Sequence, residues 1–308
     1  MKKHVLVLAV LSLALISCDK VEEPVKPSIE LDTALYPGNW NDYTFPTFQP
    51  NTNTQRNVLL EDYTGHRCPN CPDANWLAKG IEDQNPNNVI VVSVHAAPGG
   101  ISSFQETAAD CGLPSNPNDK YCTQFYCDES IEYGQFFSSG FGFYGNPQGT
   151  VNRIDFDNSE MFMLSSGWAD KVNQVLTEND LKVNMQSISN YYPETNGVFL
   201  HNEIEILEDL NVSEFGFAVY VVEHEVIDWQ DSLSTAVEFY KHHNILRGCL
   251  ENNPWGEIIV GDFSSGTKIN VDYSYKLPSG YTNSELFFVI YAYNVDTKEI
   301  YQVIKHEF

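Results

Sequence analysis

The sequence has few cations, and this scarcity excludes several kinds of partner. Lysine and arginine together number 17, against 42 aspartate and glutamate residues, so the formal net charge is −25. A chain with this excess of negative charge repels nucleic acid and anionic membrane surfaces. We therefore expect neither of them to be a partner.

The sequence also lacks the short motifs that bind nucleotides and cofactors. It has no phosphate-binding loop, no dinucleotide-binding glycine fingerprint and no Gly-x-Ser-x-Gly motif. After residue 18, no apolar run reaches the roughly 20 residues that a transmembrane helix needs. The sequence therefore predicts no cofactor, and a chain that is exposed to water beyond its N-terminus.

Residues 1–18 have the pattern of a bacterial lipoprotein signal peptide. Lys2 and Lys3 supply positive charge, Val5–Ile16 is an unbroken run of apolar and small residues, and Cys18 ends the segment. In such signals the cysteine is acylated and becomes the mature N-terminus, and several acyl chains give stable attachment. The alternative is an ordinary signal with a chance cysteine. We expect an outer-membrane protein anchored by lipid on Cys18, on the periplasmic or the cell-surface face.

Asp19–Arg56 has the composition of a tether, with prolines at short intervals and the polar run Asn51–Thr54. The charged residues of Asp19–Glu23 resemble the export signals of some Bacteroidetes surface lipoproteins, and they equally suit a solvated spacer.

The most informative stretch is Asn57–Asp73, which places two cysteines between a strand and a helix. Val58–Leu60 is typical of a buried strand, and the apolar residues of Ala74–Ile81 lie on one face of a helix. Cys68 and Cys71 fall at the exposed helix N-terminus, where backbone N–H groups and the helix dipole favour a thiolate. Because their spacing also allows a disulfide, the pattern predicts a redox site.

Two other interpretations of these cysteines stay open. They could form a purely structural disulfide, or half of a zinc site that Cys122 and Cys127 would complete. Zinc ribbons are usually more compact, and the six cysteines that remain after Cys18 suit an oxidising compartment. We therefore favour a redox pair and expect no metal.

His95 follows Val89–Val94, a β-branched run typical of a strand buried in a parallel sheet. The carboxyl ends of such strands are where α/β sheets form sites. His95 is either a proton-transfer group near Cys68 or, as we prefer, a hydrogen-bonded residue that caps the strand.

Residues 96–145 are a long insertion, of the kind that forms a lid or a binding surface. Tyr121–Phe137 can be helical, and Cys122 and Cys127 would then point to different faces. We therefore predict that Cys111 pairs with one of them, preferentially Cys122. Leu164–Leu176 is a second predicted helix after the insertion.

Residues 181–308 alternate apolar and polar side chains, as in Phe215–Val221, and predict about seven strands of an immunoglobulin-like sandwich. Residues 228–254 interrupt this pattern with a predicted helix at Thr235–Arg247. His242 and His243 lie there without visible metal-ligating partners, so we expect them to pack and to form hydrogen bonds.

The order strand, CxxC helix, strand, insertion, proline turn, strand, helix resembles the thioredoxin fold. The resemblance implies a cis-proline at Pro147 that faces the cysteines and binds peptide backbone. It also implies a buried acid at Asp62, with Glu61 beside it. Here Pro-Asn separates the cysteines and Arg67 precedes them, where thioredoxins have Gly-Pro and tryptophan, so the direction of electron transfer stays open.

Three motifs together, LLEDYTGHRCPNCP, PQGTVNR and YKHHNILRG, resemble the outer membrane protein 28-related family of Bacteroidetes lipoproteins. That resemblance implies an α/β thioredoxin-like domain followed by a β-rich domain. We therefore divide the chain into a signal peptide (1–18), a tether (19–56), a thioredoxin-like domain (57–180, with the insertion 96–145) and a β-sandwich domain (181–308).

Two functions fit this sequence. In the first, the protein exchanges disulfides with exported proteins or peptides: Cys68 attacks, Cys71 resolves, Asp62 accepts a proton and Pro147 holds the substrate strand. In the second, the protein is a surface-exposed binding or adhesion module, and its CxxC is only a structural disulfide. We favour the first.

Overall fold

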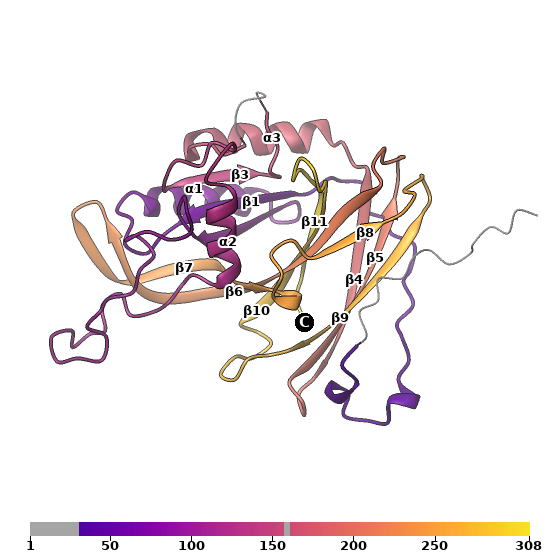
Figure 1. The fold of residues 1–308 in the computed structure, drawn as a ribbon, viewed down its shortest axis with the longest axis horizontal. Helices are drawn as coiled ribbons and strands as arrows, with labels where there is room; N and C mark the ends of the chain where they lie inside the picture. The colour runs from indigo at the N-terminus through magenta and orange to yellow at the C-terminus, as the bar shows by residue number, and fades with distance from the viewer. Residues whose placement is uncertain (1–30, 157–160) are drawn as a thin grey trace, which may run out of the picture.

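The computed structural model describes residues 31–156 and 161–308, so the predicted signal peptide and Cys18 lie outside the described residues. These described residues form a mixed α/β structure with two sheets and few helices (Figure 1). The helices are α1 (Cys71–Gln84), α2 (Asp128–Phe136) and α3 (Trp168–Glu178), with short 3-10 helices η1 (Thr33–Leu35), η2 (Trp40–Asp42), η3 (Ser165–Gly167) and η4 (Leu250–Asn252). The strands are β1 (Val58–Thr64), β2 (Val89–His95), β3 (Gln148–Val151), β4 (Val183–Tyr192), β5 (Gly197–Ile206), β6 (Glu214–Ser232), β7 (Thr235–Cys249), β8 (Glu257–Val260), β9 (Lys268–Lys276), β10 (Leu286–Tyr293) and β11 (Ile300–His306).

The larger sheet joins both halves of the chain. Its strands follow the order β11-β10-β6-β7-β2-β1-β3, and β8 also pairs with β6. β1 and β2 are parallel, whereas β3 is antiparallel to β1. β2 meets β7 at one parallel pair, Ser93 with Ile245. The predicted division at residue 180 therefore separates strands that share one sheet.

Alternate side chains of β1 enter two different cores. Val58 and Leu60 pack with residues of α1 and α3, whereas Leu59 and Tyr63 pack with Tyr133 and other aromatic residues. Every residue of β1 and β2 is buried, as their apolar runs predict for strands covered on both faces. Glu61 and Asp62, which are neighbours in β1, therefore lie on opposite faces of the strand and in different surroundings.

The smaller sheet, of order β4-β5-β9, packs against β6 and β10 of the larger sheet. The core between the two sheets is apolar and includes Leu200 of β5, Phe217 of β6, Tyr273 of β9 and Ile290 of β10. The alternating pattern of the C-terminal sequence thus corresponds to strands with one face in this core.

Residues 31–56, predicted as part of the tether, contact the smaller sheet. Leu35 is buried, and Asn53 donates a hydrogen bond of 2.9 Å to the side-chain oxygen of Asn184 on β4. The hydroxyl group of Tyr43 lies 2.6 Å from Nε2 of His201 on β5. This part of the segment therefore has a defined place on the sheet.

The helix predicted over Thr235–Arg247 is wrong, because these residues belong to β7. They pair with β6 from the tight turn at Ser232 and Thr235 back to Tyr220 and Cys249. Cross-strand pairing outweighs the weak helical spacing of the apolar residues. Residues 226–243, the distal part of this hairpin, extend away from the body (Figure 1), and we call them the arm.

The helix predicted over Tyr121–Phe137 is only partly correct, because α2 begins at Asp128. Tyr121 has a φ of 60°, a left-handed conformation that an α-helix does not accommodate, and Cys127 is extended at the N-cap. The helix predicted over Leu164–Leu176 forms as η3 and α3.

Candidate redox site at the N-terminus of α1

The Cys68–Cys71 disulfide joins the turn after β1 to the first residue of α1, as predicted. The two Cα atoms are 5.4 Å apart. The turn runs close to the insertion, since a Cβ atom on Gly65 would lie 2.6 Å from the carbonyl oxygen of Phe104. Glycine at position 65 therefore permits the close approach that places the two cysteines.

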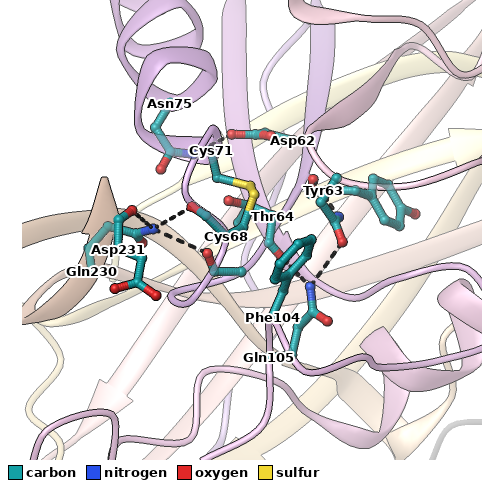
Figure 2. Close-up of a disulfide and its surroundings, with 12 residues drawn as sticks. Asp62, Tyr63, Thr64, Cys68, Cys71, Asn75, Phe104, Gln105, Gln230 and Asp231 are labelled. Atoms are coloured by element: carbon teal, nitrogen blue, oxygen red, sulfur yellow. Dashed lines mark hydrogen bonds between the residues drawn. A yellow bond between two sulfur atoms is a disulfide. The ribbon is translucent and has the colours of Figure 1, made fainter. Parts of the chain in front are cut away.

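Both cysteines are buried, and the arm contributes to their cover. Cys68 is 1% exposed and Cys71 is fully buried, so the exposed Cys68 expected from the sequence is wrong for the disulfide form. The amide group of Gln230 donates hydrogen bonds to the carbonyl oxygens of Cys68, at 3.1 Å, and Gly65, at 3.3 Å (Figure 2). The N–H group of Leu233 donates to the carbonyl oxygen of Pro69, at 2.8 Å. A distant part of the sequence thus closes over the motif.

The insertion holds the arm in this position. The hydroxyl group of Tyr121 donates a hydrogen bond to the carboxylate of Asp231, and that of Thr123 donates to Asp228. The indole N–H of Trp229 also donates to a backbone carbonyl of the insertion, at 3.3 Å. The insertion and the arm therefore form one cover over the disulfide.

Asp62 places a buried carboxyl group on the α1 side of the site. It points toward α1 and lies on the Cys71 side of the disulfide (Figure 2). Asn75, one helical turn after Cys71, donates a hydrogen bond to it, and the hydroxyl group of Tyr240 donates to Asn75 at 3.1 Å. Burial raises the pKa of Asp62 to about 7, and the hydrogen bond from Asn75 offsets part of that rise. This carboxyl group gains and loses its proton near neutral pH, as a proton acceptor for a thiol requires.

Glu61 points to the opposite face of β1 and forms a separate buried network. Arg153 donates two hydrogen bonds of 2.8 Å to its carboxylate, and the hydroxyl groups of Thr150 and Tyr220 donate at 2.9 and 2.8 Å. Burial acts to raise the pKa of Glu61, but the charge and hydrogen bonds of Arg153, with those of the two hydroxyl groups, lower it overall. Glu61 is therefore an ionised structural residue. Arg153 is not among the site residues predicted from the sequence, and its place in the PQGTVNR motif, two residues after β3, is the signal that could have found it.

Pro147 follows a cis peptide bond, as the thioredoxin resemblance implies. The side chain of Asn146 donates hydrogen bonds to the carbonyl oxygens of Tyr63, at 2.8 Å, and Ala96, at 2.9 Å. These bonds tie the proline turn to the ends of β1 and β2. Pro147 and Asn70, which lies between the two cysteines, both line an open groove of about 770 Å³. The proline turn and the CxxC turn therefore border one groove.

The family model described as outer membrane protein Omp28 matches residues 135–308, more than half of the chain. The chain belongs to the Omp28 family. This membership confirms the family resemblance of the sequence motifs, and it supports the predicted outer-membrane location. The matched segment of this Omp28 chain includes Pro147, Arg153 and the arm, and it begins after the two cysteines.

A solved structure shows a similar fold. HBP35 of Porphyromonas gingivalis is 15% identical over 83% of this chain and 76% of its own, with a TM-score of 0.60. A domain of the outer membrane lipoprotein Omp28 from the same organism is 23% identical over 41% of this chain and 87% of its own, with a TM-score of 0.27. No curated protein matches. In the described part of this Omp28 chain, no helix has the length and apolarity to cross a bilayer.

His95 of this Omp28 chain lies in a buried group of three histidines around Phe125. The ring centroid of Phe125 is 4.9 Å from that of His95, 5.3 Å from that of His66 and 4.3 Å from that of His242. Burial lowers the pKa of His95 well below its ordinary value and that of His242 to about 3. Nδ1 of His95 is buried without a hydrogen-bond partner among the described residues, so the hydrogen bond expected of a capping residue is missing at that atom. The three rings are uncharged and pack on a phenyl ring. They confirm the packing predicted for His242, which additionally lies 3.3 Å from the carbonyl oxygen of Trp229.

Cys111 pairs with Cys122, with Cα atoms 5.5 Å apart, which confirms the predicted disulfide in the insertion. Cys127 and Cys249 are free thiols. Of the four cysteines in the alternative zinc site, only Cys127 is therefore free, and that alternative is wrong for this form of the protein.

Proposed function

We propose that this protein is a lipid-anchored outer-membrane protein that exchanges disulfides with exported polypeptides through Cys68 and Cys71. The observation that carries the proposal is the buried carboxyl group of Asp62 beside the disulfide, with a pKa of about 7. Strongly shifted pKa values of this kind are concentrated at functional sites. A purely structural disulfide does not require a buried carboxyl group beside it, and burying the ionised form of that group costs free energy of folding.

A thioredoxin-like domain followed by an immunoglobulin-like sandwich is part of the same proposal. The parallel pairing of β1 with β2, the CxxC at the start of α1 and the cis-Pro147 before β3 support the first domain. The packing of the β4-β5-β9 sheet on β6 and β10 supports the second.

The exchange takes place in two balanced steps. In the reduced protein, the Cys68 thiolate attacks a substrate disulfide, which forms a mixed disulfide and releases one substrate thiolate. Asp62 then takes the proton of Cys71, and the Cys71 thiolate attacks the Cys68 sulfur and releases the second substrate thiolate. Two electrons pass to the substrate, the Cys68–Cys71 disulfide re-forms, and the reverse sequence oxidises a substrate dithiol. Because both cysteines are buried as the disulfide, the hydrogen bonds that Gln230 and Leu233 donate to the motif open when a partner reacts, while Tyr240 of the arm keeps its contact with α1.

A Cys71→Ser variant tests this proposal directly. It is expected to accumulate mixed disulfides between Cys68 and exported proteins, because the thiol that resolves them is gone. Affinity capture from cells, followed by electrophoresis with and without reductant, measures these adducts. The matched control is the variant that also carries Cys68→Ser, which should form none.

The second candidate function is a binding module whose CxxC is structural, and the burial of both cysteines favours it. The same experiment separates the two functions. Absence of adducts, together with a purified protein that neither reduces nor oxidises a model disulfide, would reject the exchange function in favour of the binding module.

Lipid attachment at Cys18 is a further part of the proposal. A Cys18→Ala variant is expected to leave the membrane fraction or to stall before maturation, because no acyl chain can be added to alanine. Fractionation with metabolic labelling by a fatty acid measures both outcomes. A variant that stays fully membrane-bound would contradict the anchor.

A further inference from the structure

Large apolar side chains are exposed on two elements next to the CxxC motif. Trp76 on the outer face of α1 is 73% exposed, and Phe239 on the arm is 76% exposed. Leu77 of α1 and Leu233 at the tip of the arm are also exposed. Single exposed apolar residues are ordinary, but a group of them on neighbouring elements is typical of an interaction site.

These elements enclose a pocket of about 240 Å³ between α1 and β7. Trp76 and Lys79 line it from the helix, and Val237, Phe239 and Tyr240 line it from the arm. The pocket is mainly apolar and has the size of one large side chain. It is coupled to the redox site, because Tyr240 donates a hydrogen bond to Asn75, which in turn donates to Asp62.

The charges around the pocket are balanced, in contrast to the net charge of −25 of the whole chain. Lys79 forms an ion pair with Asp83, and Lys241 forms one with Glu225 at 3.0 Å. A locally neutral, apolar surface suits an uncharged apolar segment. Two copies of this chain would instead repel each other through their common negative charge, so a second copy is the poorer occupant.

We infer that the pocket between α1 and the arm binds a large apolar side chain from an unfolded segment of the polypeptide that reacts at Cys68. A folded partner keeps such side chains in its own core, whereas an exported chain that has not yet folded exposes them near its cysteines. The inference rests on the proposed function and adds its substrate class: unfolded polypeptides with an apolar or aromatic residue near the reactive cysteine.

The test measures binding separately from exchange. The probe is a short fluorescein-labelled peptide of glycine and serine with a central Phe-Leu-Phe and no cysteine, and fluorescence anisotropy gives its Kd for the mature chain. The variant Trp76→Ser with Phe239→Ser is expected to weaken binding at least tenfold. The matched control, Ile258→Ser with Val260→Ser, removes exposed apolar side chains of β8 and should change the Kd less than twofold.

Exchange with 2-hydroxyethyl disulfide, which is too small to need the pocket, is measured on the same proteins. We expect the Trp76→Ser, Phe239→Ser variant to keep its rate with this small disulfide and to lose it with an unfolded protein substrate. Peptide binding without any exchange would sustain the docking site and reject only the proposed chemistry. The inference is overturned if the peptide does not bind, if the control variant loses binding equally, or if sedimentation finds a dimer that the Trp76→Ser, Phe239→Ser variant abolishes.

Discussion

Replacing Asp62 with asparagine is expected to stabilise the folded protein by about 4 kcal/mol at pH 8. The carboxyl group of Asp62 titrates near 3.8 in the unfolded chain and at about 7 in the folded protein, and this difference corresponds to about 4 kcal/mol. Above pH 7 the folded protein must bury a carboxylate that the unfolded chain exposes to water. Asparagine keeps the hydrogen bond from Asn75 and removes that cost.

The sign of this effect depends on pH. Below about pH 4 the carboxyl group is protonated in both the folded and the unfolded state, so its titration does not change the free energy of unfolding. Between about pH 4 and pH 7 the unfolded chain releases the proton and the folded protein keeps it, so the wild type loses stability as pH rises. Urea denaturation of both oxidised proteins at pH 4 and pH 8 measures the difference. If the two proteins differ in free energy of unfolding by the same amount at pH 4 and at pH 8, the titration of Asp62 is not the cause of the difference.

The same substitution is expected to slow exchange with a model disulfide about a hundredfold at pH 7, because Cys71 loses its proton acceptor. Asp73→Asn is the matched control, since Asp73 is an exposed carboxylate in the first turn of the same helix. It should leave both the stability and the rate nearly unchanged. If Asp62→Asn is more stable than the wild type and exchanges disulfides at the same rate, Asp62 is not the proton acceptor for Cys71.

Replacing Arg153 with methionine is expected to destabilise the protein by about 3–5 kcal/mol, because it leaves Glu61 buried and unpaired. Both side chains of this ion pair are fully buried. Adding Glu61→Gln should restore most of the loss, since an amide carries no charge, its oxygen accepts a hydrogen bond from one of the two hydroxyl groups of Thr150 and Tyr220, and its NH2 group can donate to the other. Urea denaturation at pH 7 measures all three proteins.

A surface ion pair provides the control for Arg153. Lys268→Met breaks the 2.9 Å contact of Lys268 with Glu203, and it should cost less than about 1 kcal/mol because the lysine is exposed to solvent. If Glu61→Gln brought no recovery to Arg153→Met, the cost would come from lost packing of the arginine against the aromatic rings around it.

The sequence predicts the features of the site that depend on neighbouring residues. The apolar run at Val58 predicts β1, the CxxC marks the start of α1, and the β-branched run at Val89 predicts β2. Cys111 and Cys122 are also close in sequence, so the spacing of the cysteines was enough to favour a disulfide between them.

The features that the sequence does not predict all depend on contacts between distant segments. Residues 235–247 have a weak helical spacing, and only their pairing with β6 makes them a strand. The burial of Cys68 needs Gln230 and Leu233, which follow it at a long distance in the sequence. Glu61 and Asp62 are adjacent acids, and the partners that separate their roles, Arg153 and Asn75, come from different elements.

The junction between β2 and β7 also determines the order in which the chain can fold. β2 is an apolar strand, and the neighbour that covers its outer edge comes from a segment made much later in synthesis. Contacts between such distant segments form slowly, because a long loop must close first. Until β7 pairs with it at Ser93, β2 presents an unpaired apolar edge, which can associate with other chains. The completion of this sheet therefore depends on a long-range contact, and not on the length of the chain alone.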